Sequence, residues 1–204
     1  TATNSAGSDI ETKIDYITVD PDIVGTVSDI DGNTYMTIEI GSQTWMAENL
    51  KTSRYADATS IPHVENTTAW DALTANDPAY CWFNGSSGNA AIYGNLYNWP
   101  AAMNGAASTD ANPSGVQGVC PAGWHIPSDS EWKEMEIYLG MSSSAADELD
   151  FRGSDEGGKL KEVGLEHWWS PNTGATNESG FTALPGGFRR DDASFYGQGI
   201  FADI

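Results

Sequence analysis

One stretch of the chain, Val119–Trp132, constrains the fold more than any other because it carries a complete helix start. Ser128 is placed as an N-cap, and Glu131 three residues later completes an S-x-x-E capping box. The pattern predicts a helix that begins at Ser128 and is ended by Gly140. Its apolar face is expected to pack against a core, because apolar side chains recur at helical spacing, at Trp132, Met135 and Leu139.

Residues 23–50 predict a β-meander. Ile23–Val27 is a short β-prone run, and Thr34–Ile40 alternates between polar and apolar side chains. Between them, Asp29–Asn33 has the composition of a tight turn. Gln43–Leu50 follows as a further strand or edge segment. This part of the chain is therefore expected to form a hairpin or a meander.

The remaining residues are rich in glycine, asparagine and aromatic side chains, which is typical of long ordered loops. Short helical turns are predicted at residues 67–73 and 96–103, and a short helix at 144–149. We therefore predict an α+β fold with short β-strands, one or two helices and long loops anchored by aromatic residues. The residues expected to be mostly buried are Trp45, Leu50, Tyr97, Trp99, Trp124, Trp132, Phe181 and Leu184.

The chain is strongly acidic, with 29 Asp and Glu against 9 Lys and Arg and a formal net charge of -20. This charge argues against nucleic acid or an anionic membrane surface as a partner, because few cations are available to replace phosphate counterions. It is typical of solubility in an extracellular or salty setting, and capture of divalent cations is the alternative. No run of about 18 apolar residues occurs, so the sequence predicts no membrane span.

Asp29, Asp31 and Asn33 have the D-x-D-x-N spacing that opens an EF-hand calcium loop. Ile40 stands at the position where a full loop has its bidentate glutamate. A hairpin turn is therefore favoured over a calcium site at these three residues. These three residues are nevertheless the candidate metal ligands, and we expect one or two calcium ions in the carboxylate-rich loops, where they would add order rather than catalysis.

Few residues of this chain are placed to carry catalysis, and the sequence does not support an enzyme. His63, His125 and His167 are isolated, and His125 is expected to be packed or hydrogen-bonded rather than a ligand or base. No G-x-S-x-G motif supplies a nucleophile. The two cysteines, Cys81 and Cys120, are predicted to form a disulfide in an oxidising compartment, with two buried thiols as the alternative.

The late segment Gly186–Tyr196 differs in character from the rest of the chain. It concentrates two of the four arginines beside two aspartates and several aromatic residues, and these residue types make efficient binding surfaces. A solvated, ion-paired hairpin is the slightly favoured alternative. The candidate ligand-binding residues are Arg189, Arg190, Asp191, Asp192, Phe195 and Tyr196.

Five sequence blocks follow one another along the chain. They are DIDGNTY at 29–35, GSQTWMAENLK at 41–51, YGNLYNWP at 93–100, GVCPAGWH at 118–125 and SGFTALPGGF at 179–188. Together they resemble the Fibrobacter succinogenes major paralogous domain, a module of secreted and surface proteins of bacteria. The resemblance implies a C-type-lectin-like fold for residues 27–204, related to the formylglycine-generating enzyme scaffold, with residues 1–26 as an N-terminal extension.

The resemblance implies a secreted, non-enzymatic module at the bacterial cell surface that binds or adheres to an extracellular glycan or protein. In related lectin-like folds the late loops often face ligands, and calcium is often used. The competing class is an enzyme on the formylglycine-generating scaffold. That chemistry relies on a late pair of reactive cysteines, and no cysteine follows Cys120.

Family members usually continue into a Trp-Ser-Ser segment and a closing strand with an Arg-Cys-Val motif, and this sequence has neither. We expect a truncated or incompletely read domain, or one completed by another chain; Cys120 would then have the cysteine of that motif as an alternative partner. The β-prone segment 13–19 is expected to add to an open sheet edge of the next subunit, giving a homo-oligomer or filament. A cell-anchored monomer is the equal alternative, and the start at Thr1 indicates a processed chain or a fragment.

Overall fold

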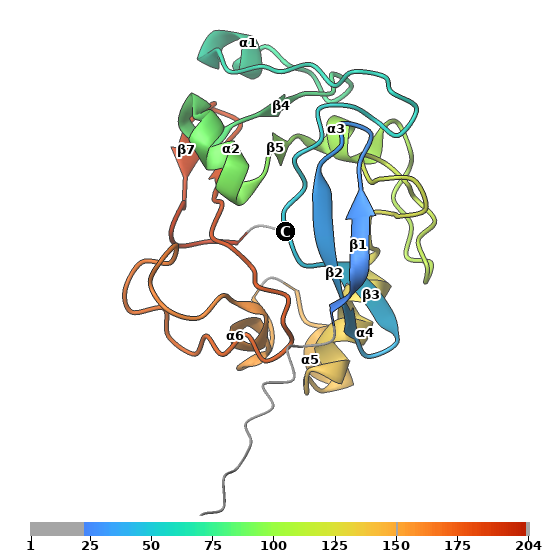
Figure 1. The fold of residues 1–204 in the computed structure, drawn as a ribbon, viewed down its shortest axis with the longest axis vertical. Helices are drawn as coiled ribbons and strands as arrows, with labels where there is room; N and C mark the ends of the chain where they lie inside the picture. Colours follow the sequence, from blue (N-terminus) through green and yellow to red (C-terminus); the bar gives the residue numbers. More distant parts are fainter. Residues whose placement is uncertain (1–22, 150, 203–204) are drawn as a thin grey trace, which may run out of the picture.

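A three-stranded antiparallel sheet organises the N-terminal part of the fold (Figure 1). The computed structural model describes residues 23–149 and 151–202, so the expected donor strand at 13–19 lies outside the described residues. The strands β1 (Ile23–Ser28), β2 (Thr34–Ile40) and β3 (Gln43–Met46) lie in the order β1-β2-β3. The predicted meander is confirmed, with β3 shorter than predicted, and the expected domain boundary at residue 27 falls within β1.

Strand β2 is buried on both faces. Tyr35 and Thr37 point to one face of the sheet, and Ile38 and Ile40 point to the other, because side chains alternate along a strand. All four side chains are buried, and Tyr35 is fully inaccessible. The sheet therefore has the main apolar core on one side and a buried tyrosine on the other.

The predicted helix is confirmed as α4, which spans Asp129–Tyr138. The Ser128 hydroxyl accepts a hydrogen bond from the Glu131 N–H, and the Glu131 carboxylate accepts one from the Ser128 N–H, which completes the capping box. The ring of Trp132 lies 4.8 Å from the ring of Trp45 on β3, measured between centroids. The buried residues of the main core, which joins α4 to the sheet, are Ile38, Ile40, Met135, Phe181 and Ala183.

A second apolar cluster holds the loops of the middle part of the chain. The strand β4 (Tyr80–Cys81) pairs with β5 (Leu96–Tyr97), and α2 (Ser87–Tyr93) connects them. The predicted helical turns are present as α1 (Thr67–Asp71) and α3 (Trp99–Met103). The buried residues of this cluster are Tyr55, Ile61, Tyr80, Ala101 and Val119.

The C-terminal part adds two short helices, α5 (Ser143–Ala146) and α6 (Glu156–Leu160), and a two-stranded hairpin. The hairpin strands are β6 (Phe188–Arg189) and β7 (Phe195–Tyr196), and β7 lies beside α2 in Figure 1. The Phe195 ring lies 5.1 Å from the ring of Phe83, which opens a single 3-10 turn before α2. The hairpin therefore packs on residues that lie about half the chain away.

These elements confirm the α+β class. The described residues contain six α-helices rather than the one or two predicted, but five of the six have seven residues or fewer. Such single turns are too short for the periodicity that identifies a longer helix. In the part of the chain that the structure describes, no helix is long and apolar enough to cross a membrane.

The predicted core is only partly correct, and Trp99 is wrong, because its side chain is 65% exposed. Trp99 is the first residue of α3, where the Cα–Cβ bond points toward the helix N-terminus and carries the ring past the helix end. The buried positions of α3 are Ala101 and Met103. Of the other predicted residues, Phe181 is buried, and those partly buried are Trp45, Leu50, Tyr97, Trp124, Trp132 and Leu184.

The predicted disulfide is also wrong, since Cys81 and Cys120 are both free thiols. Tyr80 and Cys81 are neighbours on β4, so their side chains point to opposite faces. Tyr80 packs in the same cluster as Val119, next to Cys120, whereas Cys81 reaches the Arg189 guanidinium. Burial raises the pKa of the Cys81 thiol to about 11 and that of Cys120 to about 12.

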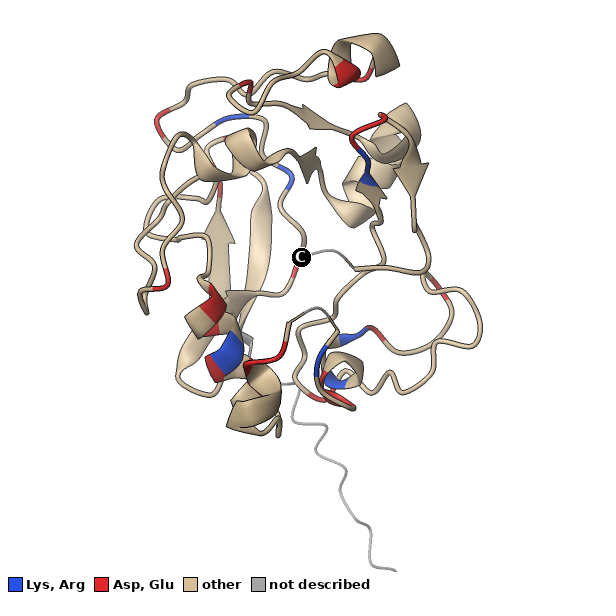
Figure 2. Ribbon diagram, turned by 180° about the vertical axis from the view of Figure 1, so that it is seen from behind, with Lys and Arg blue, Asp and Glu red and all other residues tan. Residues whose placement is uncertain are grey.

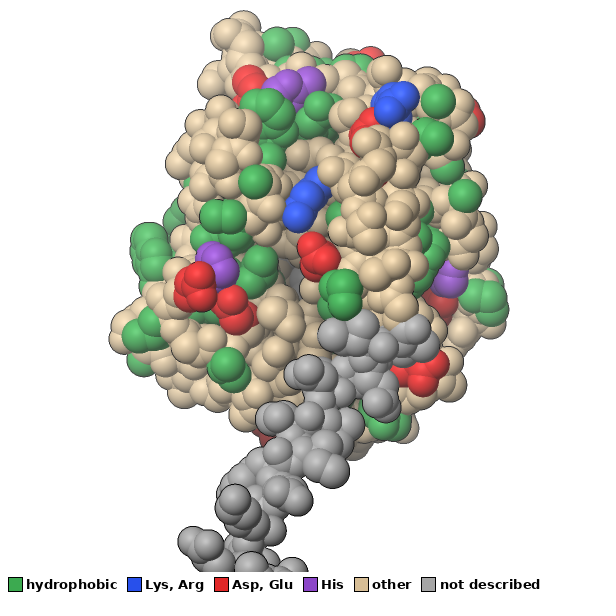
Figure 3. All heavy atoms as spheres, in the orientation of Figure 1, with side chains coloured by type: hydrophobic (Ala, Val, Ile, Leu, Met, Phe, Trp, Pro, Cys, Tyr) green, Lys and Arg blue, Asp and Glu red, His purple; other side chains and the backbone are tan. Residues whose placement is uncertain are grey.

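Acidic residues are spread over the fold, and the hydrophobic side chains seen on one face are divided among small groups. Figure 2 shows Asp and Glu residues in helices, loops and hairpin alike rather than on one side of the fold. On the face drawn in Figure 3, hydrophobic side chains form small separate groups. Among the described residues, the face drawn in Figure 3 therefore carries no large continuous apolar patch of the kind that marks an interaction surface.

Candidate functional site

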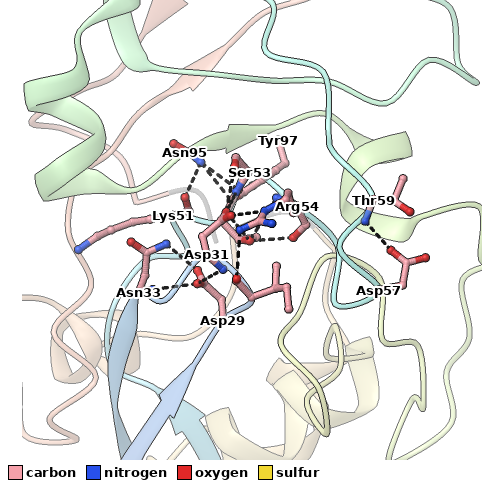
Figure 4. Close-up of polar contacts among 12 residues, drawn as sticks. Asp29, Asp31, Asn33, Lys51, Ser53, Arg54, Asp57, Thr59, Asn95 and Tyr97 are labelled. Atoms are coloured by element: carbon pink, nitrogen blue, oxygen red, sulfur yellow. Dashed lines mark hydrogen bonds and ion pairs between the residues drawn. The ribbon is translucent and has the colours of Figure 1, made fainter.

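The turn at residues 29–33 is built around the carboxylate of Asp29 (Figure 4). One of its oxygens, Oδ1, accepts from the backbone N–H groups of Asp31 and Asn33, each at 2.9 Å. The other, Oδ2, accepts from Asn33 Nδ2 at 2.8 Å and from the Tyr35 hydroxyl at 2.5 Å. Four protein donors therefore satisfy this carboxylate.

The carboxylate of Asp31 joins the same turn to the loop that follows β3. Its Oδ1 lies 2.5 Å from Nε of Arg54, and its Oδ2 accepts from the N–H and the hydroxyl of Ser53 (Figure 4). Burial acts to raise the pKa of Asp31, but these hydrogen bonds lower it below its usual value. The D-x-D-x-N residues thus lie together, in a structural turn.

The surroundings of these carboxylates do not fit a calcium ion. Calcium binds roughly six to eight oxygen ligands. Here the oxygens of Asp29 and Asp31 already face N–H and O–H donors, and Asn33 presents its amide nitrogen. Among residues 23–149 and 151–202, no group of three or more His, Cys, Asp or Glu side chains is placed to hold a metal ion. Asp29, Asp31 and Asn33 therefore form a structural turn rather than a calcium site, and calcium in the other carboxylate-rich loops stays a prediction.

Each histidine pairs with a carboxylate. His125 Nε2 lies 2.6 Å from Glu131 Oε1, so this histidine is hydrogen-bonded, as predicted. Glu131 uses its second oxygen for the N–H groups of Ser128 and Ser114, and the pair therefore supports the start of α4. The other two pairs are His63 with Glu65 at 2.6 Å and His167 with Glu162 at 2.8 Å.

The β6–β7 hairpin carries the six candidate ligand-binding residues, and its inner face is structural. The Arg189 guanidinium donates to the carbonyl oxygens of Val64 at 2.9 Å, Glu65 at 3.0 Å and Ala193 at 3.2 Å. It also stacks on the ring of Phe195, 4.8 Å from its centroid. Arg189 therefore fixes the hairpin to the segment before α1, and both Arg189 and Phe195 are half-buried.

The outer face of the hairpin is exposed. The Arg190 guanidinium lies 4.4 Å from the ring centroid of Tyr196, and the Tyr196 side chain is 45% exposed. Phe188 and Phe201 pack beside Tyr196, with ring centroids 5.8 and 6.0 Å from it. Alternation along the strands explains the division, since Phe188, Arg190 and Tyr196 lie on the face opposite Arg189.

The hairpin tip is a turn that holds Asp191 and Asp192 in place. The Arg190 N–H donates to the Ser194 carbonyl at 2.8 Å, which closes the turn. Asp192 Oδ1 accepts from the N–H and the hydroxyl of Ser194, and Asp191 Oδ1 accepts from the Asp192 N–H. The hydrogen bonds from Ser194 hold the pKa of Asp192 below its usual value. Both carboxylates are exposed.

An open groove of about 620 Å³ lies between this tip, α1 with the loop after it, and the start of α3. Trp70 of α1 provides its aromatic wall, and one face of this ring is covered by the Arg189 guanidinium, 4.4 Å from the centroid. Trp99 lies between the groove residues Asn98 and Pro100 in the sequence, and its side chain is exposed. The polar side chains that line the groove are Asp71, Thr74, Asn98, Asp191 and Asp192.

The groove contains acceptors that the protein itself does not use. The Thr74 hydroxyl donates a hydrogen bond to the Asp77 carboxylate, and the Asn98 side-chain amide donates one to the Asp77 carbonyl oxygen. By contrast, Asp71 and the Oδ2 atoms of Asp191 and Asp192 receive no hydrogen bond from any residue that the structure describes. A bound molecule that offers hydrogen-bond donors would find acceptors here.

The structure thus divides the predicted ligand-binding residues. Asp191 and Asp192 line the groove, Arg190 and Tyr196 lie on the exposed outer face, and Arg189 and Phe195 are half-buried on the inner face. Sequence reasoning missed Trp70, Asp71 and Asn98, which come from distant segments. The sequence does contain a signal for the helix that carries Trp70, because asparagine is a favoured N-cap residue and Asn66 caps α1.

The fold and the groove define an α+β domain with a surface recess of aromatic and carboxylate side chains. The profile of one family, the Fibrobacter succinogenes major domain, matches residues 38–204. The chain belongs to this family, as the five sequence blocks predicted. No curated protein and no solved structure matches the chain.

Proposed function

We propose that this domain is a secreted, non-enzymatic module at the bacterial cell surface, with a C-type-lectin-like fold, that binds an extracellular glycan or protein. The observation that carries the proposal is the groove at the hairpin tip. It combines an aromatic wall at Trp70 with the carboxylates of Asp71, Asp191 and Asp192, which have unused acceptors. Pockets that bind ligands typically pair apolar or aromatic walls with a few placed polar groups.

The rigidity of the groove supports a binding role. Arg189 donates to three carbonyl oxygens and stacks on Trp70, so it fixes the hairpin and the aromatic wall relative to each other. Asn98 holds the start of α3 through the N–H groups of Ala79 and Ala101. A site that is already ordered loses little conformational entropy when a ligand binds.

The state of the two thiols supports a function other than catalysis. Burial keeps the pKa values of Cys81 and Cys120 near 11 and 12, so both are protonated at neutral pH. A protonated thiol is a poor nucleophile. The filament alternative depends on residues 13–19, which lie outside the described residues, and it stays a prediction.

An array of glycans and extracellular matrix proteins, probed with the labelled chain, tests the proposal. We expect at least one array component to bind, and the double variant Asp191→Asn/Asp192→Asn to bind it at least about tenfold more weakly. Asp110→Asn, at an exposed aspartate outside the groove, is the matched control. The proposal fails if no component binds, or if the groove variant and the control bind equally well.

A further inference from the structure

We propose that the groove binds an uncharged oligosaccharide directly, without a metal ion. This inference rests on the proposed function and commits it to one ligand class. The unused polar atoms of the groove side chains are carboxylate oxygens and the Trp70 indole nitrogen, which makes no hydrogen bond to any described residue. Sugar hydroxyls donate to carboxylates in short, charge-assisted hydrogen bonds and can accept from an indole N–H.

The charges around the groove favour an uncharged ligand over an anionic one. No lysine or arginine is among the residues that line it. The three guanidinium nitrogens of Arg189 are committed to backbone carbonyls behind the aromatic wall. An acidic glycan or a phosphate group would therefore meet Asp71, Asp191 and Asp192 without a cation to pair with, which is unfavourable.

A cationic ligand is also disfavoured, although three carboxylates line the groove. The positive charge of Arg189 lies directly behind the Trp70 ring, and it opposes a second cation on the other face. Arg190 lies close enough to Asp192 to lower the pKa of that carboxylate. Arg189 and Arg190, which lie outside the groove lining, thus offset part of the negative charge there, and we expect hydrogen bonding rather than ion pairing to hold the ligand.

Trp70 provides apolar surface for a sugar ring. Its indole lines the groove, and the Arg189 guanidinium lies over one of its two faces. The C–H groups on one face of a pyranose ring carry partial positive charge and stack on the electron-rich face of an indole. The face of Trp70 turned away from Arg189 is therefore the one on which a sugar ring would stack.

Isothermal titration calorimetry on the full chain, in buffer with EDTA, tests the inference. The probes are neutral hexasaccharides of β-1,4-linked glucose, N-acetylglucosamine and mannose, with hexalysine and a sulfated hexasaccharide as charged comparators. The informative variants are Trp70→Ala, which removes the aromatic wall, and Asp191→Asn/Asp192→Asn. Their matched controls are Trp169→Ala, at a tryptophan that is 67% exposed and does not line the groove, and Asp110→Asn.

We expect a neutral hexasaccharide to bind in EDTA, and each groove variant to weaken its binding at least about tenfold, which corresponds to about 1.4 kcal/mol. Both controls should stay within about twofold of the parent chain. Raising NaCl to about 0.5 M should change the affinity little, because screening acts on charged pairs.

Three results would overturn the inference. If hexalysine or the sulfated sugar is the only ligand, the groove binds charge, and the proposed binding function stands without its glycan. If a neutral sugar binds both groove variants as well as the controls, its site lies elsewhere. If no hexasaccharide binds while a protein on the array does, the ligand is a protein.

Discussion

At the scale of single residues, carboxylates in this chain act mainly as hydrogen-bond acceptors that organise turns. Asp29 closes the 29–33 turn, Asp31 holds the next loop, and Asp77 caps the loop after α1 through Thr74. The oxygens that a metal ion would need are thus occupied by N–H and O–H groups. This explains how a calcium-like spacing can serve a purely structural turn.

Replacing Asp29 with alanine should destabilise the fold strongly. The change removes the acceptor of the buried Tyr35 hydroxyl and of two backbone N–H groups. Buried donors left without partners should lower the free energy of unfolding by about 2–4 kcal/mol. Urea unfolding measures the loss, with Asp57→Ala, at an exposed aspartate bonded only to Thr59, as the control. Equal stability of the two variants would contradict the role of Asp29.

Glu131 should make the stability of the fold dependent on pH. Burial alone would raise the pKa of Glu131, but hydrogen bonds from the Ser128 and Ser114 N–H groups and from His125 lower it below its usual value. A lowered folded-state pKa contributes stability above the unfolded value of about 4.3, and this contribution is lost as the pH falls through the folded value.

The variant Glu131→Gln tests this contribution. It should be less stable than the parent chain at pH 7, and the difference should shrink as the pH falls below about 4. Denaturant unfolding at a series of pH values measures it. A difference that stays constant from neutral to acidic pH would show that the charge of Glu131 does not matter.

At the scale of elements, most helices and strands are too short to be stable alone and depend on contacts between distant segments. The β6–β7 hairpin has two residues in each strand, and Arg189 fixes it to residues 64 and 65. Its neighbour Arg190 stacks only on the outer aromatic rings. Adjacent arginines thus have opposite roles, which composition cannot distinguish.

Lysine substitutions at these two positions should differ in their effect. Arg189→Lys replaces a planar fork that reaches three carbonyls with one ammonium group, and it should cost about 1–3 kcal/mol of stability. Arg190→Lys, at an exposed position, should cost less than about 0.5 kcal/mol. Thermal unfolding of the two variants provides the comparison. A larger loss at Arg190 would mean that the inner and outer faces are wrongly assigned.

At the scale of the whole molecule, features that depend on residues close together in the sequence could be predicted. Features that form from distant segments could not. The Ser128–Glu131 capping box and the alternation of β2 depend on neighbours three or two residues apart, so the sequence reveals them directly. The exposure of Trp99 and the separation of Cys81 from Cys120 depend on which face of an element meets the core. The groove joins residues 70–75, 98–100 and 191–192, and only the last pair was identified in advance.

The groove at the hairpin tip is the proposed ligand-binding site, and nuclear magnetic resonance tests this assignment directly. The chain has eight tryptophans, and each indole N–H gives its own signal in an ¹⁵N-labelled sample. On titration with the component that binds on the array, the signals of the Trp70 indole and of the Asp191 and Asp192 amides should shift, while that of the Trp169 indole should not. Shifts confined to Trp169 or to the α4 tryptophan, Trp132, would contradict the claim.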